Sequence, residues 1–219
     1  MDIKIPLINR LKKESHRQIA FAQDLIIEEV YKVIPKAVLH GGTCIWRCYF
    51  GKRFSEDLDF YFPNDKRKIN EIFEKLKKQG FEILKKKISE RSVYSELKYK
   101  RTSVRLEATF QKKIGELLNY EKINGTIVPI YGLGPEQLIK EKANTYLKRK
   151  KIRDLYDVYF LLKYIKRFKE IEKEIEELIK KYAPPLDKEN LKIIILEGII
   201  PECEDLIKYI KRKWENPNI

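Results

Sequence analysis

The chain has 219 residues, of which 43% are hydrophobic and 37% charged, and its formal net charge is +14. This length is sufficient for one large domain or two small ones with a buried core. The charge favours polyanionic partners such as RNA or DNA. A membrane-spanning protein is disfavoured, because no apolar run approaches the ~20 residues that a spanning helix needs. The first residues contain no apolar signal segment, so we expect a cytoplasmic protein.

The first predicted elements are a long helical region and a short strand. Apolar residues recur at helical spacing between residues 6 and 34, and Pro35 stops the helix. The apolar run 37–39 then predicts a buried strand. We expect the helical region to pack on the sheet that this strand begins, which makes its role structural.

The pair Gly41-Gly42 comes directly after this strand and predicts a turn that only residues without a side chain can make closely against a ligand. Thr43 is predicted to open a short helix over residues 43–50. We expect its hydroxyl and the unpaired N–H groups of the first turn to face outward and to bind phosphate oxygens. A glycine pair by itself is an ordinary turn in most proteins. Its interpretation as a phosphate-binding turn therefore depends on the strand that comes next in the chain.

The next predicted strand covers residues 57–62 and carries two acids, Asp57 and Asp59. Side chains alternate along a strand, so both acids point to one face while Leu58 and Phe60 point into the core. Two adjacent carboxylates repel each other unless a cation lies between them. Beside a phosphate-binding turn the cation that fits best is Mg²⁺, with Mn²⁺ as an alternative. An Asp-x-Asp pair alone is more often a solvated strand face, but the combination with the glycine pair is much more specific.

These two motifs resemble the signature of the AbiEii/AbiGii type of nucleotidyltransferase, a branch of the polymerase β-like superfamily. The resemblance rests on Gly41-Gly42-Thr43 and on Arg53 to Phe60 within Gly-Lys-Arg-Phe-Ser-Glu-Asp-Leu-Asp-Phe. It implies an α+β fold: a polymerase β-like nucleotidyltransferase domain, with a mixed sheet and helices, followed by a C-terminal helical bundle. It also implies a toxin of an abortive-infection toxin–antitoxin pair, and phosphate contacts from Arg53 and Ser55.

Further strands are predicted at residues 81–88, 92–100 and 103–110, after a helix that ends at Gly80. The last strand alternates well and places Glu107 on the polar face. In polymerase β-like enzymes a third acid comes from a later strand, so the resemblance makes Glu107 the candidate third metal ligand. A surface glutamate on an edge strand is equally compatible with the pattern.

A short strand at 126–130 precedes the expected domain boundary, which we place between residues 1–134 and 135–219. The rest is predicted to be helical, and its final part is a pair of charged helices over 169–181 and 188–213. Pro201 lies inside the second of these and is expected to kink or end it.

The helical part carries the second half of the resemblance. In the family, a helix with a Lys-x-x-Ala-like segment is followed by a basic turn and by Arg-Asp-x-x-Asp, which correspond here to Lys142, the basic run 148–151 and residues 153–157. The resemblance implies that Lys142 binds nucleotide phosphates and that Asp154, or as second choice Asp157, acts near the active site. A salt bridge between these acids and Lys142 is equally compatible with the sequence.

The resulting hypothesis is transfer of a nucleotidyl group from an NTP, with Asp57, Asp59 and Glu107 holding Mg²⁺. The expected acceptor is RNA, because the net charge is positive and some basic clusters are interleaved with tyrosines. The resemblance implies the 3′ end of tRNA in particular, since some members of the family extend tRNA with nucleotides. A cognate antitoxin is a possible protein partner. Two alternatives stay open: adenylylation of a protein acceptor, and a catalytically inactive module that binds nucleic acid or a partner.

Overall fold

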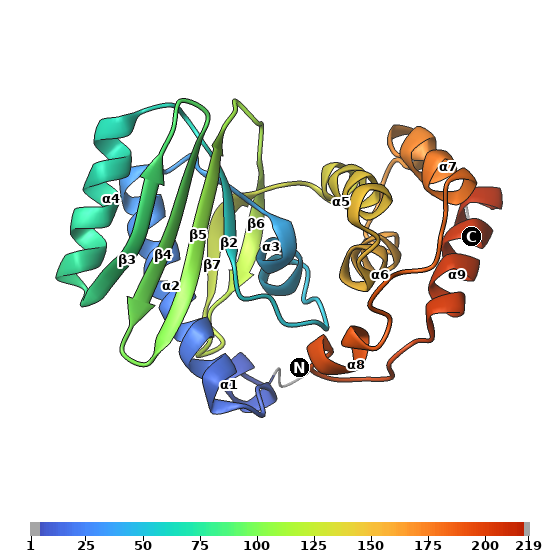
Figure 1. Cartoon of the computed structure of the whole chain (residues 1–219), viewed down its shortest axis with the longest axis horizontal. Helices are drawn as coiled ribbons and strands as arrows, with labels where there is room; N and C mark the ends of the chain where they lie inside the picture. The colour runs from blue at the N-terminus through green and yellow to red at the C-terminus, as the bar shows by residue number, and fades with distance from the viewer. Residues whose placement is uncertain (1–4, 217–219) are drawn as a thin grey trace. The chain divides into compact units, whose positions relative to one another are not determined.

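The structure is a computed structural model that describes residues 5–216. The chain divides into two compact units, residues 1–133 and residues 134–219. The first unit contains a seven-stranded mixed sheet with helices, and the described part of the second is mainly helical (Figure 1). The predicted α+β fold class is therefore confirmed.

The sheet has the strand order β3-β4-β5-β2-β1-β7-β6. Its strands are β1 (Val38–His40), β2 (Leu58–Phe62), β3 (Phe81–Ile88), β4 (Ser92–Tyr99), β5 (Thr102–Phe110), β6 (Glu116–Glu121) and β7 (Ile127–Gly132). The pairs β2–β5 and β1–β7 are parallel, and the other neighbours are antiparallel. The parallel pair β2–β5 joins strands that are far apart in the sequence, and it forms the centre of the candidate site.

Two helices, α2 (Glu14–Val33) and α4 (Lys66–Lys78), cover one face of the sheet (Figure 1). The sequence of α4 explains its position, because its buried residues recur at helical spacing; they are Ile69, Ile72, Phe73 and Leu76. Asp65 caps this helix by accepting hydrogen bonds from the N–H groups of Arg67 and Lys68. The shorter helices of this unit are α1 (Leu7–Arg10) and α3 (Gly41–Cys48), and α3 packs against β1, β2 and β6.

Strand β2 alternates as predicted. Leu58 and Phe60 are fully buried under the helices, while Asp59 is half-buried and lies on the other face. Each fully buried side chain of this size contributes about 1.5–3 kcal/mol to stability. The same alternation holds in β5, where Val104 and Leu106 are buried and Glu107 is half-buried. Helix packing therefore fixes which face of the sheet carries the acids.

Several predicted elements have different bounds in the structure. The helical region 6–34 is divided into α1 and α2, and the helix expected at 43–50 begins already at Gly41. Strand β6 was not predicted, because its sequence Glu-Leu-Leu-Asn-Tyr-Glu does not alternate regularly between apolar and polar residues. The helix expected over 188–213 is two helices, α8 (Asn190–Ile194) and α9 (Cys203–Glu215), with Pro201 between them.

The second unit consists of α5 (Pro135–Arg149), α6 (Ile152–Leu161), a 3₁₀ turn at Phe168–Glu170, α7 (Glu172–Lys180), α8 and α9. Its core is formed by fully buried leucines from four of these helices; they are Leu138, Leu155, Leu178 and Leu206. In the part of the chain that the structure describes, no helix combines the length and apolar character needed to span a bilayer.

Candidate active site

The loop between β1 and α3 lies directly against Asp59. Gly41 has φ of +70°, and a Cβ atom added to it would lie 2.1 Å from the Oδ2 atom of Asp59. Both the backbone conformation and the close approach therefore require glycine at this position. The chain turns from strand to helix here, so the first turn of α3 is placed next to a carboxylate of β2.

Four side chains form a row across the open face of the sheet. His40 on β1 is the register partner of Asp59 on β2, which is opposite Glu107 on β5, which is opposite Tyr94 on β4. We call these four residues the acidic row. They line a pocket of about 130 Å³, together with residues of the adjacent positions. The ring of His40 also stacks on Tyr61, with centroids 4.1 Å apart.

The two acids of this row repel each other. Burial raises the pKa of the Glu107 carboxyl above its ordinary value, and the nearby charges of Asp59 and Asp57 raise it further. The ionised forms of these carboxylates destabilise one another until a cation or a proton neutralises part of their charge. Acids with a perturbed pKa in a pocket are typical of functional sites.

Asp57 comes directly before β2 and is paired with an arginine. Both of its carboxylate oxygens accept hydrogen bonds from the guanidinium of Arg105, each at 2.7 Å. The Asp57 carbonyl oxygen accepts a further hydrogen bond from the Thr43 hydroxyl. Arg105 precedes Glu107 by two residues on β5, so this ion pair lies on the same face of the sheet as the acidic row.

Of the predicted phosphate-binding residues, Gly42, Arg53 and Ser55 lie together. A Cβ atom on Gly42 would lie 2.5 Å from the Ser55 hydroxyl oxygen and 2.7 Å from Nη2 of Arg53. Arg53 is buried and donates a hydrogen bond to the Phe54 carbonyl oxygen. The predicted orientation of Thr43 was wrong: its side chain is fully buried and its hydroxyl holds Asp57, because the residue lies inside α3 and not at its first position.

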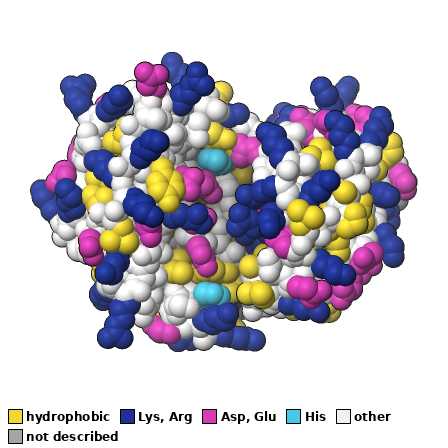
Figure 2. Space-filling model, viewed as in Figure 1, with side chains coloured by type: hydrophobic (Ala, Val, Ile, Leu, Met, Phe, Trp, Pro, Cys, Tyr) yellow, Lys and Arg dark blue, Asp and Glu magenta, His cyan; other side chains and the backbone are white. Residues whose placement is uncertain are grey.

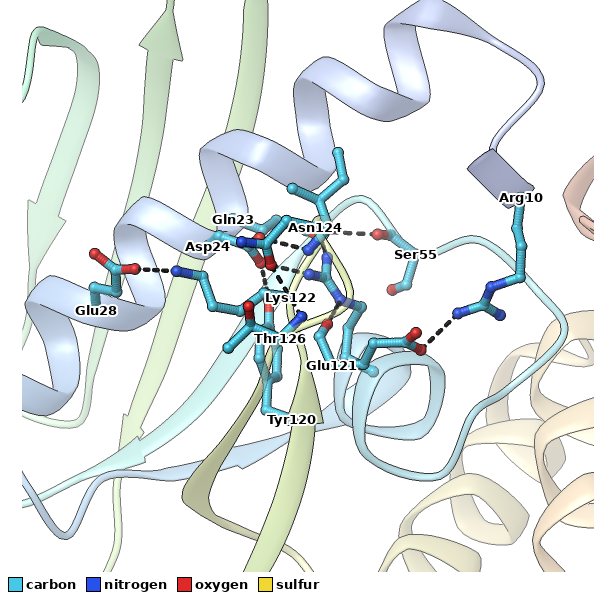
Figure 3. A network of polar contacts seen from close by, with 12 residues as sticks. Arg10, Gln23, Asp24, Glu28, Ser55, Tyr120, Glu121, Lys122, Asn124 and Thr126 are labelled. Carbon is cyan, nitrogen blue, oxygen red and sulfur yellow. Dashed lines mark hydrogen bonds and ion pairs between the residues drawn. The ribbon is translucent and has the colours of Figure 1, made fainter. Parts of the chain in front are cut away.

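A buried polar network supports the segment that leads into Asp57 (Figure 3). The Gln23 amide on α2 donates hydrogen bonds to the carbonyl oxygens of Ser55 and Glu56, at 2.9 and 3.0 Å. Next to it, the fully buried Arg47 of α3 forms an ion pair with Asp24 of α2. Helix α2 therefore holds both α3, which begins at Gly41, and the 55–56 segment, which directly precedes Asp57.

In the second unit, Lys142 is paired with the two acids of the later motif. Its Nζ atom lies 2.9 Å from Oδ2 of Asp157 and 3.6 Å from Oδ1 of Asp154. Asp154 also accepts two hydrogen bonds from the guanidinium of Arg149, at 2.7 and 2.9 Å. Both acids are fully buried, so the arrangement is the salt bridge that the sequence left open.

The donors of the first unit suit a divalent ion in their chemistry. No cluster of three or more His, Cys, Asp or Glu side chains suitable for a metal occurs among residues 5–216. Mg²⁺ does not need such a cluster, since it is usually held by one or two carboxylates and by substrate phosphates. Asp59, Glu107 and Asp57 supply carboxylate oxygens on one face, and Gly41 lets the backbone of the turn approach the Asp59 carboxylate closely.

Carboxylates on two adjacent parallel strands, next to a glycine turn that leads into a helix, are the arrangement expected for a nucleotidyltransferase. The model of the family "Nucleotidyl transferase AbiEii toxin, Type IV TA system" matches residues 32–197. The chain belongs to this family and is a nucleotidyltransferase toxin. The suspected resemblance is therefore confirmed.

Solved structures show the same fold. The nucleotidyltransferase toxin MenT4 from Mycobacterium tuberculosis matches with a TM-score of 0.64 and 16% identity, over 90% of this chain and 82% of that chain. JHP933 from Helicobacter pylori matches with a TM-score of 0.56 and 19% identity, over 89% and 90% of the two chains. A putative nucleotidyltransferase from H. pylori also has a TM-score of 0.56 and 19% identity, over 90% and 93%. The search of curated proteins found no match.

Sequence reasoning missed three residues of this region: Arg105, Gln23 and Arg47. The alternation of β5 placed Arg105 on the face of Glu107, but its pairing with Asp57 depends on the parallel register of β2 and β5. Gln23 and Arg47 lie inside helices and make their contacts across long sequence distances, so no local pattern indicates them.

Proposed function

We propose that this toxin transfers a nucleotidyl group from an NTP to RNA in a reaction that depends on Mg²⁺ or Mn²⁺, with the 3′ end of tRNA as the first choice of acceptor. The observation that carries the proposal is the direct opposition of Asp59 and Glu107 on parallel strands, beside the close approach of Gly41. Asp57, Asp59 and Glu107 would hold the metal ion, which when bound offsets the charge of the triphosphate.

The chain's own residues position the reactants. Gly41, Gly42 and Ser55 would contact phosphate oxygens, and the N–H groups at the start of α3 add the favourable field of a helix N-terminus. Arg53, which packs against Gly42, and Thr43, which holds the Asp57 backbone, support this arrangement. In the second unit, we propose that Lys142 binds phosphate as a point charge, and that Asp154 or Asp157 acts near the nucleotide.

The charge of the molecule supports RNA as the acceptor. The net charge is +14, and Figure 2 shows Lys and Arg side chains spread over the visible face of both units, with acidic side chains among them. Neutralising phosphates with Lys and Arg gives most of the sequence-independent affinity for nucleic acid. We also propose a cognate antitoxin as a protein partner, and the cytoplasm, which contains NTPs and tRNA, as the place of action.

The experiment supplies each labelled NTP with Mg²⁺, with and without total tRNA, to the wild type and to Asp57→Asn. We expect label in RNA, and a rate at least about 10³-fold lower for the variant, because it removes a charge that the metal requires. Asp65→Asn is the matched control, since it removes an acid that caps α4 and lies outside the site.

Other outcomes separate the alternatives. Label in protein and not in RNA would replace the proposal with adenylylation of a protein acceptor. Absence of label under every condition, with Mn²⁺ as well as Mg²⁺, would contradict it in favour of a binding module. An equal rate for wild type and Asp57→Asn would show that the reaction uses a different site.

A further inference from the structure

Arg105 occupies the carboxylate that the proposed metal needs. Its Nε and Nη2 atoms donate to the two oxygens of Asp57, each at 2.7 Å, in a bidentate arrangement. A guanidinium in this geometry covers both oxygens of the carboxylate. The guanidinium uses one lone pair of each oxygen, and its positive charge disfavours a second cation on Asp57, so metal binding competes with the pair.

The ion pair of Arg105 and Asp57 is partly exposed to solvent, so Arg105 can exchange Asp57 for another partner. The Arg105 side chain is 47% exposed and that of Asp57 is 25% exposed. Solvent-exposed ion pairs typically contribute about 0.2–1 kcal/mol, and a bidentate pair lies toward the upper end of that range. The exchange therefore needs only a small driving force, unlike the separation of the buried pair of Arg47 and Asp24.

A second acid lies on the other side of Arg105. Glu96 on β4 is its register partner, and Glu96 in turn is paired with Lys85 on β3 at 3.2 Å. A released guanidinium thus stays on the open face of the sheet between Asp57 and Glu96. From there it lies next to Glu107, two residues further along β5.

A triphosphate offers arginine the same type of bidentate acceptor that Asp57 offers. We propose that Arg105 is exchanged from Asp57 to a phosphate of the nucleotide when the substrate binds, and that this exchange couples nucleotide binding to metal binding. The inference rests on the proposed function. It assigns Arg105 two partners: Asp57 in the free enzyme and the triphosphate in the complex.

The coupling has a thermodynamic consequence. Metal alone binds Asp57 against the positive charge of Arg105, whereas metal in the nucleotide complex finds Asp57 already released. Replacing Arg105 should strengthen the binding of metal alone and leave its binding to the nucleotide complex much less changed. By linkage, the gain in nucleotide affinity that metal produces must then shrink by the same factor.

The test measures binding and not turnover. Calorimetry with Mn²⁺ alone compares the wild type with Arg105→Gln, and a fluorescent nonhydrolysable triphosphate is titrated with and without saturating Mg²⁺. We expect Mn²⁺ to bind Arg105→Gln about threefold to tenfold more tightly than the wild type, as removal of a surface ion pair predicts. The nucleotide alone should bind this variant more weakly, because one phosphate contact is lost.

Three variants make the result specific. Lys98→Gln removes a positive charge from the same face of the sheet without touching Asp57, and its Mn²⁺ affinity should equal that of the wild type. Arg105→Lys keeps the charge but loses the bidentate contact, so its Mn²⁺ affinity should lie between those of the wild type and Arg105→Gln. In an Asp57→Asn background, Arg105→Gln should no longer change Mn²⁺ binding.

Equal Mn²⁺ affinities of the wild type and Arg105→Gln would overturn the inference, and so would an equal increase in Lys98→Gln. Thermal unfolding of each variant shows that it is folded, and Arg105→Lys repeats the test if Arg105→Gln is not. A failure of the Arg105 inference is distinguishable from a failure of the proposed function, because nucleotidyl transfer by the wild type tests the proposed function independently.

Discussion

A methyl group on Gly41 would have no space, because the site for it lies 2.1 Å from the Asp59 carboxylate and the backbone has φ of +70°. We expect Gly41→Ala to lower the nucleotidyl-transfer rate at least about 100-fold, since Asp59 must move. We also expect it to lower the free energy of unfolding by about 1–3 kcal/mol. Both are measured on the same preparation, by labelled transfer and by urea unfolding.

Gly80→Ala is the matched control. Gly80 also has a positive φ, of +91°, but a Cβ atom there would meet its nearest neighbour, Tyr99, only at 3.9 Å. It should lose about 1 kcal/mol of stability through backbone strain and keep the transfer rate. A Gly41→Ala variant with an unchanged rate would show that the close approach to Asp59 has no part in catalysis.

Glu107 should make the metal-free protein less stable at neutral pH. Its pKa is raised in the folded state, by burial and then by Asp59 and Asp57, so the folded protein holds this proton more tightly than the unfolded chain. Stability therefore falls as pH rises from the ordinary value of 4.5 through the raised pKa, and it stays lower above it. Glu107→Gln should raise the free energy of unfolding at pH 7 by about 0.2–1 kcal/mol, the cost of like charges on paired strands.

The measurement is urea unfolding of the metal-free protein at neutral pH and at a pH below the ordinary value. The gain should vanish at the lower pH, where the acid is protonated in both states. Glu96→Gln serves as the control on the same face, because Glu96 is paired with Lys85 and its removal should give no gain. Loss of stability in Glu107→Gln at neutral pH would mean that Glu107 is a structural residue.

Among the elements, α2 has a larger role than the structural helix that its sequence predicts. Gln23 holds the carbonyl oxygens of Ser55 and Glu56, directly before Asp57. Gln23→Leu should cost about 1–3 kcal/mol of stability by leaving polar groups unpaired. It should also lower the transfer rate about tenfold, because the segment that positions Asp57 is no longer held.

The control on the same helix is Gln18→Leu. Gln18 is hydrogen-bonded only weakly to Glu14, at 3.4 Å, in an exposed position. Its replacement should change neither the stability nor the rate by much. If both leucine variants reduced the rate equally, the contact of Gln23 with the 55–56 segment would have no specific effect. The rate should be compared at saturating NTP, so that the positioning effect is separated from binding.

The sequence predicts features that depend on neighbouring residues better than features that depend on residues far apart in the chain. The alternation in β2 and β5 is local, so it predicted correctly which side chains face the helices. The identity of neighbours across the sheet is not local. Asp59 meets Glu107 because β2 and β5 run parallel, which the residue pattern does not specify. The pairings of Arg105 and Gln23 escaped sequence reasoning for the same reason, and β6 escaped it because its apolar and polar residues do not alternate regularly.

For the molecule as a whole, the charge of +14 predicts a steep dependence of RNA binding on salt. If the protein contacts about six phosphates, its affinity should fall about 10³-fold between 50 and 200 mM salt. Fluorescence anisotropy with labelled tRNA at several salt concentrations gives the slope. The control is a fluorescent NTP, whose affinity should change much less because a single small ligand releases fewer counterions. RNA affinity that is insensitive to salt would contradict a charge-driven interface.

The parallel pairing of β2 with β5 also has a consequence for biosynthesis. Asp59 and Glu107 are brought together only after the intervening helix and two strands have been made. A growing polypeptide on the ribosome that has not yet exposed β5 therefore lacks Glu107, one of the three proposed metal-binding carboxylates. We expect transfer activity only in chains whose β5 has already paired with β2.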